Sequence, residues 1–246
     1  MIAATILSLI PAALPAQGPL TPDRVDTYER VLDEYKKAGL DWRRAKRQAK
    51  KDGTLDAFDQ PHPVETFFAR FAVLAEAGDP DALLWTGLNV EDLGRTAGEV
   101  AELKRSVFAR LIEEFPGETA VKSLVDRLEA QDEWLTDAEI IGFLSAAYER
   151  TPLEAAKASA AYRLGRRFEV QGDEAGLAQA QTWYETVVAK YASSREARKA
   201  EGRLNGLKTA VGRMAPDFDA VDVDGNAFKL SDYRGKVTVI DFWGFW

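Results

Sequence analysis

The chain has 246 residues, of which 46% are hydrophobic and 29% charged, and it carries a formal net charge of −8. This composition is typical of a soluble globular protein with one large or two small hydrophobic cores, and the acidic balance argues against nucleic acid as a partner. The sequence contains no cysteine, so packing alone must hold these residues together.

The N-terminal residues predict an export signal. Ile2 to Leu14 is an uncharged apolar stretch with the small residues Ala13 and Ala16 near its end, as in signal peptides. No Lys or Arg precedes it and Pro11 interrupts it, and it is shorter than the ~20 residues that span a bilayer. We expect residues 1–17 to be a signal peptide and the protein to be exported, to the periplasm or the cell envelope. An uncleaved interfacial anchor is the alternative.

Helical periodicity dominates residues 18–210, and we expect an all-helical domain there. Thr21-Pro22-Asp23 predicts a helix start, and apolar residues from Tyr28 to Tyr35 then follow at helical spacing. Pro, Gly and Asp turns separate the later segments, which favours antiparallel neighbours. Further helices are expected around Phe67 to Leu74, from Pro80, over Val100–Phe115, Ala120–Leu135, Asp137–Tyr148 and Glu154–Val170, and from Leu177 to about Leu207 with an interruption at Ser193-Ser194.

Two of these helices resemble a tetratricopeptide pair, in which a small residue lets two helices approach closely and aromatic residues fill the groove. The turn between them is about three residues longer than in the repeat. A non-repeating helical bundle is the alternative. A helical-repeat body would offer a concave surface to a protein partner. The residues that carry this resemblance are Tyr162, Leu164, Gly165 and Phe168, then Ala180, Tyr184, Val187 and Tyr191.

Catalytic groups are scarce in the helical region. His62 is the only histidine and stands between two prolines, which predicts an exposed loop residue and neither a zinc ligand nor a triad member. We expect no metal and no cofactor. The aromatic residues Trp85, Trp134, Trp183 and Tyr184 are expected in the core, with a ligand groove as the alternative.

The helical region contains one strongly basic run, within residues 43–51. It is expected to be a solvated helix face, although it could contact phosphate or an anionic membrane. Its members are Arg43, Arg44, Lys46, Arg47, Lys50 and Lys51.

The last residues change from helical to strand-like periodicity. Phe218, Val221 and Val223 begin a strand pattern, and Asp224-Gly225 predicts a hairpin turn. Asp222, Asp224 and Asn226 resemble the start of a calcium loop, but no Glu follows at its twelfth position, so a turn is the better interpretation.

Val237 to Trp243 then predicts a strand covered on both faces. Within this run Asp241 is an acid without an obvious partner. A buried acid of this kind points to a functional role.

Several spaced motifs of this region together resemble the opening of an exported thioredoxin-like domain. The family is the TlpA/ResA type of thiol-disulfide oxidoreductase, related to the AhpC/TSA peroxiredoxins, and the resemblance covers about 35 residues. The motifs are Gly212-x-x-Ala215-Pro216-Asp217-Phe218, Asp224-Gly225, Leu230-Ser231-Asp232-Tyr233-Arg234-Gly235-Lys236 and Val239-Ile240-Asp241-Phe242-Trp243-Gly244-Phe245-Trp246.

The resemblance implies roles for three residues. A Cys-x-x-Cys would follow Trp246 directly, Asp241 would be the buried carboxylate that moves a proton to the resolving thiol, and Trp243 would pack near the active-site loop. The run Trp243-Gly244-Phe245 departs mildly from the family, in which alanine is commoner after the first tryptophan.

The predicted fold is therefore mainly α, with a helical-hairpin body followed by the incomplete β start of a thioredoxin-like α/β domain over residues 211–246. The first hypothesis is a truncated thiol-disulfide oxidoreductase, inactive without its cysteines, whose full-length parent acts on protein thiols or disulfides. The alternatives are a helical interaction scaffold with a redox-dead remnant and a peroxiredoxin-type parent.

Overall fold

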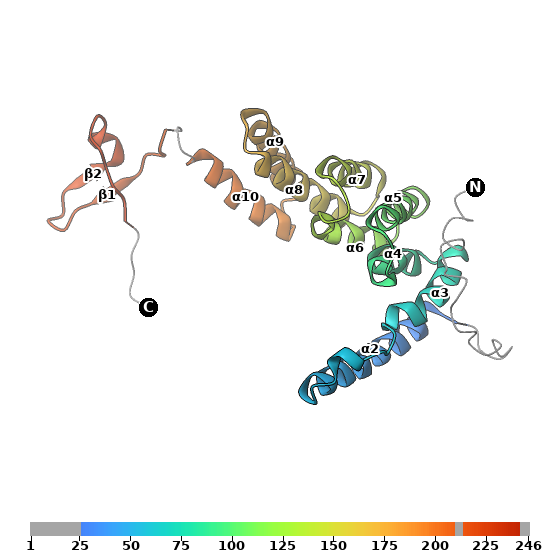
Figure 1. Cartoon of the computed structure of the whole chain (residues 1–246). Coiled ribbons are helices and arrows are strands. Elements are labelled where there is room, and N and C mark those ends of the chain that lie inside the picture. Colours follow the sequence, from blue (N-terminus) through green and yellow to red (C-terminus); the bar gives the residue numbers. More distant parts are fainter. Residues whose placement is uncertain (1–25, 210–213, 242–246) are drawn as a thin grey trace.

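The computed structural model describes residues 26–209 and 214–241, and within them the chain is mainly α-helical, with one two-stranded sheet near its C-terminus. Figure 1 shows the helices following one another in a curved row from α2 to α10. No helix in this part of the chain is both long and apolar enough to cross a membrane. The helices are α2 (Tyr28–Lys51), α3 (Pro63–Glu76), α4 (Pro80–Asn89), α5 (Ala97–Glu114), α6 (Thr119–Arg127), α7 (Asp137–Arg150), α8 (Glu154–Gln171), α9 (Glu174–Lys190) and α10 (Arg195–Lys208).

Polar caps set most helix starts. Asp79 caps α4 with its carboxylate on the amide of Ala82 at 2.8 Å, and Pro80 occupies the first turn, where its missing N–H costs nothing. Thr96 and Thr136 begin α5 and α7 with capping boxes, in which a glutamate three residues later bonds back to the cap. The starts of α4 and α7 lie where the sequence predicted them.

Several boundaries differ from the prediction. Helices α5 and α9 begin at Ala97 and Glu174, each three residues before the predicted start. Helix α2 begins at Tyr28 because Thr27 is extended and its hydroxyl accepts from the amide of Arg30 at 3.4 Å. The Asp26 carboxylate just before this cap pairs with Arg70 of α3 at 2.8 Å; Thr21-Pro22-Asp23 lies outside the described residues. Helix α6 ends at Arg127 and continues as the 3₁₀ turn η3 (Leu128–Gln131). The predicted interruption at Ser193-Ser194 is a full break, since Ser194 caps a separate α10.

The largest core joins α2 to α8, and aromatic rings fill its N-terminal end. Trp85 of α4 stacks on Phe71 of α3 with ring centroids 3.8 Å apart, and Tyr35 of α2 meets Trp85 edge-on at 5.1 Å. Trp85 and Tyr184 are buried, and Trp134 and Trp183 pack partly buried against the core. The expectation that these four residues are core is confirmed.

Glycines allow the closest helix approaches. A Cβ added at Gly165 of α8 would lie 2.6 Å from a ring carbon of Tyr184 in α9, and one at Gly87 of α4 would lie 2.7 Å from Val107 in α5. Both distances are well inside van der Waals contact. Gly165 therefore acts as the sequence predicted, by letting two helices meet across an aromatic ring. The tetratricopeptide-like repeat itself stays a prediction.

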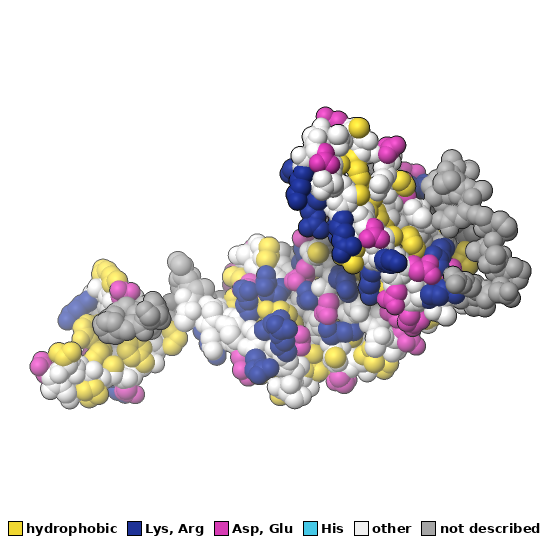
Figure 2. Space-filling model, turned by 90° about the horizontal axis from the view of Figure 1, so that it is seen from below, with side chains coloured by type: hydrophobic (Ala, Val, Ile, Leu, Met, Phe, Trp, Pro, Cys, Tyr) yellow, Lys and Arg dark blue, Asp and Glu magenta, His cyan; other side chains and the backbone are white. Residues whose placement is uncertain are grey.

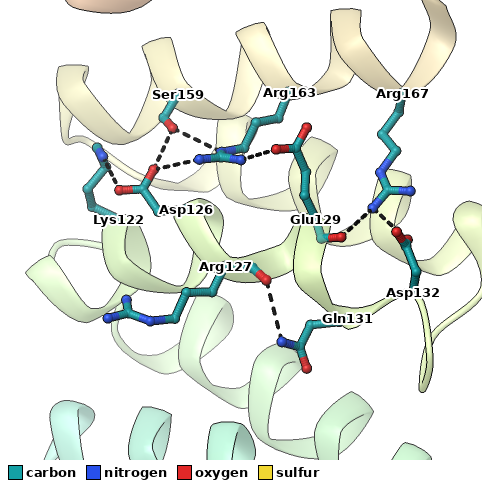
Figure 3. Close-up of polar contacts among 9 residues, drawn as sticks. All are labelled: Lys122, Asp126, Arg127, Glu129, Gln131, Asp132, Ser159, Arg163 and Arg167. Atoms are coloured by element: carbon teal, nitrogen blue, oxygen red, sulfur yellow. Dashed lines mark hydrogen bonds and ion pairs between the residues drawn. The ribbon is translucent and has the colours of Figure 1, made fainter. Parts of the chain in front are cut away.

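A polar network fastens α6 and η3 to α8 (Figure 3). Arg163 of α8 pairs with Glu129, lies 3.4 Å from Asp126, and donates to the Ser159 hydroxyl at 3.3 Å. The Ser159 hydroxyl in turn donates to Asp126 at 2.7 Å, and Arg167 donates to the Glu129 carbonyl at 3.2 Å. Because each arginine has several partners, these contacts set the register between the two halves of the helical row.

Candidate functional site

The C-terminal hairpin has the turn that its sequence predicted. Strands β1 (Asp219–Val221) and β2 (Ala227–Lys229) pair antiparallel, with Ala220 opposite Phe228. Gly225 takes a φ of 86° in the turn, a conformation that glycine adopts without steric cost.

The Asp222 side chain holds the hairpin turn together, as the turn interpretation predicted. The Asp222 carboxylate accepts from the amides of Asp224 and Asn226 at 2.9 and 2.8 Å and from the Asn226 side chain at 3.0 Å. These bonds hold the pKa of Asp222 below its usual value. Within residues 26–209 and 214–241, no group of three acidic or histidine side chains could hold a metal ion.

The turn after the hairpin folds back onto β1. It contains the 3₁₀ turn η4 (Leu230–Tyr233), whose Leu230 amide donates to the Phe218 carbonyl at 3.2 Å. The Asp217 carboxylate accepts from the Ser231 amide at 2.8 Å, and the hydrogen bonds from Ser231 hold the pKa of Asp217 below its usual value. The two flanking motifs of the hairpin are thus tied together by an acid and a serine fourteen positions apart.

The expected strand from Val237 is not formed in the part of it that the structure describes, residues 237–241. Val237 and Val239 are 98% and 88% exposed, and Asp241 is exposed as well. The reason is that a strand needs a neighbour to satisfy its backbone groups, and the only sheet among the described residues is β1 with β2. Figure 2 shows the hydrophobic side chains that this leaves on the surface of the hairpin region.

The structure does not bring the three expected site residues, Asp241, Trp243 and Trp246, together in a site. Asp241 is placed, but it lies in solvent without the burial that its expected role requires. Trp243 and Trp246 lie outside the described residues. The role of all three stays a prediction.

Comparison with known proteins identifies this segment. The AhpC/TSA family matches residues 211–246. The segment is thioredoxin-like. A thiol-disulfide oxidoreductase ResA of Geobacillus kaustophilus (strain HTA426) is 54% identical over 37 residues, which are 15% of this chain and 21% of that relative.

Two further relatives agree. The ResA of Geobacillus thermodenitrificans (strain NG80-2) is 51% identical over 37 residues, 15% of this chain and 21% of the relative. That of Bacillus thuringiensis subsp. konkukian (strain 97-27) is 38% identical over 39 residues, 16% of this chain and 22% of the relative. The chain thus spans about a fifth of the length of the curated relatives it matches. No solved structure gives a significant match.

His62 differs from its prediction. It lies in the connection before α3, as expected, but it is half-buried: its ring meets Trp42 edge-on with centroids 4.8 Å apart, and Nδ1 lies 3.9 Å from Asp92. Its amide donates to the Glu65 carboxylate at 3.1 Å. His62 therefore begins a helix and packs on a tryptophan.

The helical row also holds a buried cation that the sequence did not single out. The Nζ of Lys104 in α5 lies 2.7 Å from Glu91 and donates to the Gly87 carbonyl at 3.0 Å and to Gln131 at 2.9 Å. Burial lowers the pKa of Lys104, against the pull of Glu91. The sequence signal for this burial is the position of Lys104 four residues after Val100, which places both on the apolar face of α5.

A cavity of about 510 Å³ opens beside Gln131, between α2, α4 and α6 with η3. Its wall combines Tyr28 and Trp85 with Asp81 and Arg127. Burial and the neighbouring carboxylates raise the pKa of Asp81. The cavity could accept a side chain or a small molecule, and all its lining residues come from the helical row.

Proposed function

We propose that residues 211–246 open a thioredoxin-like redox domain and that the protein acts in thiol-disulfide exchange when a cysteine pair follows Trp246. The observation that carries this is the match of the AhpC/TSA family to residues 211–246, which contain all the spaced motifs. The substrates would be protein thiols or disulfides. Residues 18–210 would form a separate helical domain with a protein partner of its own.

The chemistry assigns each residue a part. Exchange needs a thiolate that attacks a disulfide sulfur and a second thiol that resolves the mixed disulfide. Residues 1–246 contain no cysteine, so both sulfurs must come from outside them and these residues alone are inactive. Asp241 would serve in proton transfer to the resolving thiol, and Trp243 and Trp246 would border the nucleophile.

Export fits this proposal. The apolar stretch from Ile2 to Leu14 would direct the protein out of the cytoplasm, to the periplasm or cell envelope, where disulfides form and persist. An uncleaved stretch would serve instead as an interfacial anchor.

The test uses protein expressed through the codons that follow Trp246, with reduction of insulin disulfides by dithiothreitol as the readout. Asp241→Asn should slow exchange and change its pH dependence, because the carboxylate that transfers the proton is lost. The matched control is Asp224→Asn in the exposed hairpin turn, which should behave as wild type. Equal rates for the two variants, or exchange by residues 1–246 alone, would refute the proposed roles.

A further inference from the structure

Helix α2 carries a concentration of positive charge that the acidic chain does not balance locally. Between Lys36 and Lys51 there are eight basic side chains against the one carboxylate of Asp41. At 100° per residue, seven of them fall within an arc of about 140° on one face of the helix, over a length of about 22 Å. We call this face the α2 stripe: Lys36, Lys37, Arg43, Arg44, Arg47, Lys50 and Lys51.

The stripe faces away from the protein. The opposite face of α2 is the packed one, where Val31 is buried, Tyr35 meets Phe67 edge-on and Trp42 contacts Phe58. Every member of the stripe is exposed, and Figure 2 shows Lys and Arg side chains gathered along the part of the molecule formed by α2.

Internal ion pairs neutralise little of this charge. Lys36 lies 4.0 Å from Asp33 and Arg44 lies 3.5 Å from Asp41, both through exposed groups. No carboxylate of the described residues lies within 4.0 Å of the other five cations. A straight row of unneutralised cations on a helix face is complementary to an extended anionic surface.

Apolar groups beside the stripe favour a lipid surface over a nucleic acid. Leu40 lies in the middle of the stripe and is 49% exposed, and Leu55, just after α2, is 38% exposed. An amphipathic helix that lies on a membrane inserts such side chains between headgroups. The apolar stretch from Ile2 to Leu14 stands shortly before α2 in the sequence. The net charge of −8 opposes wrapping by a polyanion but not contact with a flat surface along one face.

We propose that the α2 stripe is a docking surface for an anionic phospholipid membrane and holds the helical row against it. Electrostatic attraction supplies most of the binding, and Leu40 adds a shallow apolar contact. The proposal does not depend on the redox chemistry of the C-terminal segment.

The experiment measures sedimentation of the whole 246-residue chain with vesicles of phosphatidylglycerol and phosphatidylcholine, and with vesicles of phosphatidylcholine alone. The test variant, R43Q/R47Q/K50Q, removes three charges from the stripe. The matched control, K190Q/R198Q/K208Q, removes three exposed charges from α9 and α10. Circular dichroism establishes that both variants keep the helical content of the wild type.

We expect the wild type and the control to bind the anionic vesicles, with affinity falling as salt is raised, and the stripe variant to bind at least about tenfold more weakly. Equal binding by the two variants would overturn the proposal, as would equal binding to neutral vesicles. Competition by single-stranded DNA at lower concentration than by lipid would assign the stripe to nucleic acid and overturn it as well.

Discussion

Gly165→Ala tests how the C-terminal helices are held together. Its added Cβ would lie 2.6 and 2.7 Å from two ring carbons of Tyr184. The ring cannot move away freely, since Tyr184 is fully buried and its hydroxyl donates to Glu169 of α8 at 2.5 Å. Burial and the Glu169 bond both raise the pKa of Tyr184, so the hydroxyl stays a donor throughout the neutral range.

The expected effect is a balance of two terms. Replacing glycine by alanine inside a helix stabilises by about 1 kcal/mol when the site has room, whereas overpacking a filled core costs roughly 1–3 kcal/mol. Two ring contacts under 3 Å against a pinned side chain place Gly165→Ala at the upper end. We expect a net loss of about 2 kcal/mol in the free energy of unfolding.

Urea unfolding followed by far-ultraviolet circular dichroism measures this loss. The matched control is Gly202→Ala in α10, where an added Cβ meets nothing within 4 Å; it should stabilise by up to about 1 kcal/mol. If Gly165→Ala were as stable as Gly202→Ala, the close approach of α8 and α9 would be refuted.

Three further predictions concern other contacts. Burial opposes ionisation of Asp126, but its hydrogen bonds and the nearby cations outweigh burial and lower its pKa. The wild type should therefore be more stable than Asp126→Asn above about pH 4, and this difference should disappear as the pH falls below that value. If the urea midpoints of the two proteins were as far apart at pH 3 as at pH 7, the prediction would be contradicted. Lys104→Met leaves the half-buried Glu91 and the buried Gln131 without their cation and should cost roughly 1–3 kcal/mol in the same assay, whereas no measurable loss would contradict the role of these contacts. Asp222→Ala removes three hydrogen bonds from the hairpin turn and should lower amide exchange protection in β2, whereas Asp224→Ala in the same turn should not. Equal protection in both variants would refute the role of Asp222.

Local chemistry made most of the fold predictable. The helix starts at Asp79, Thr96 and Thr136 depend on side chains that bond to amides three residues away, and such signals can be read from the sequence. The hairpin turn at Gly225 is a signal of the same kind.

Long-range contacts account for what was missed. Asp26 pairs with Arg70, 44 residues later, and the sequence did not predict this contact. The burial of Lys104 depends on Glu91 and Gln131, which its own helix does not contain. No local pattern carries this information.

The candidate site shows the same limit. The run from Val237 has strand propensity, but Asp241 lies in solvent because strand formation depends on neighbours that the described residues do not supply. Residue propensity indicates an extended backbone at residues 237–241, but a strand forms only when another strand pairs with it.

The most direct test of the account is the coding sequence immediately downstream of the codon for Trp246, read from the source DNA and checked by mass spectrometry of the expressed protein. We predict an in-frame Cys-x-x-Cys directly after Trp246, followed by the rest of a thioredoxin-like domain. A stop codon at that point, or a continuation without cysteine, would contradict the proposed function and leave the helical row as the functional part of the protein.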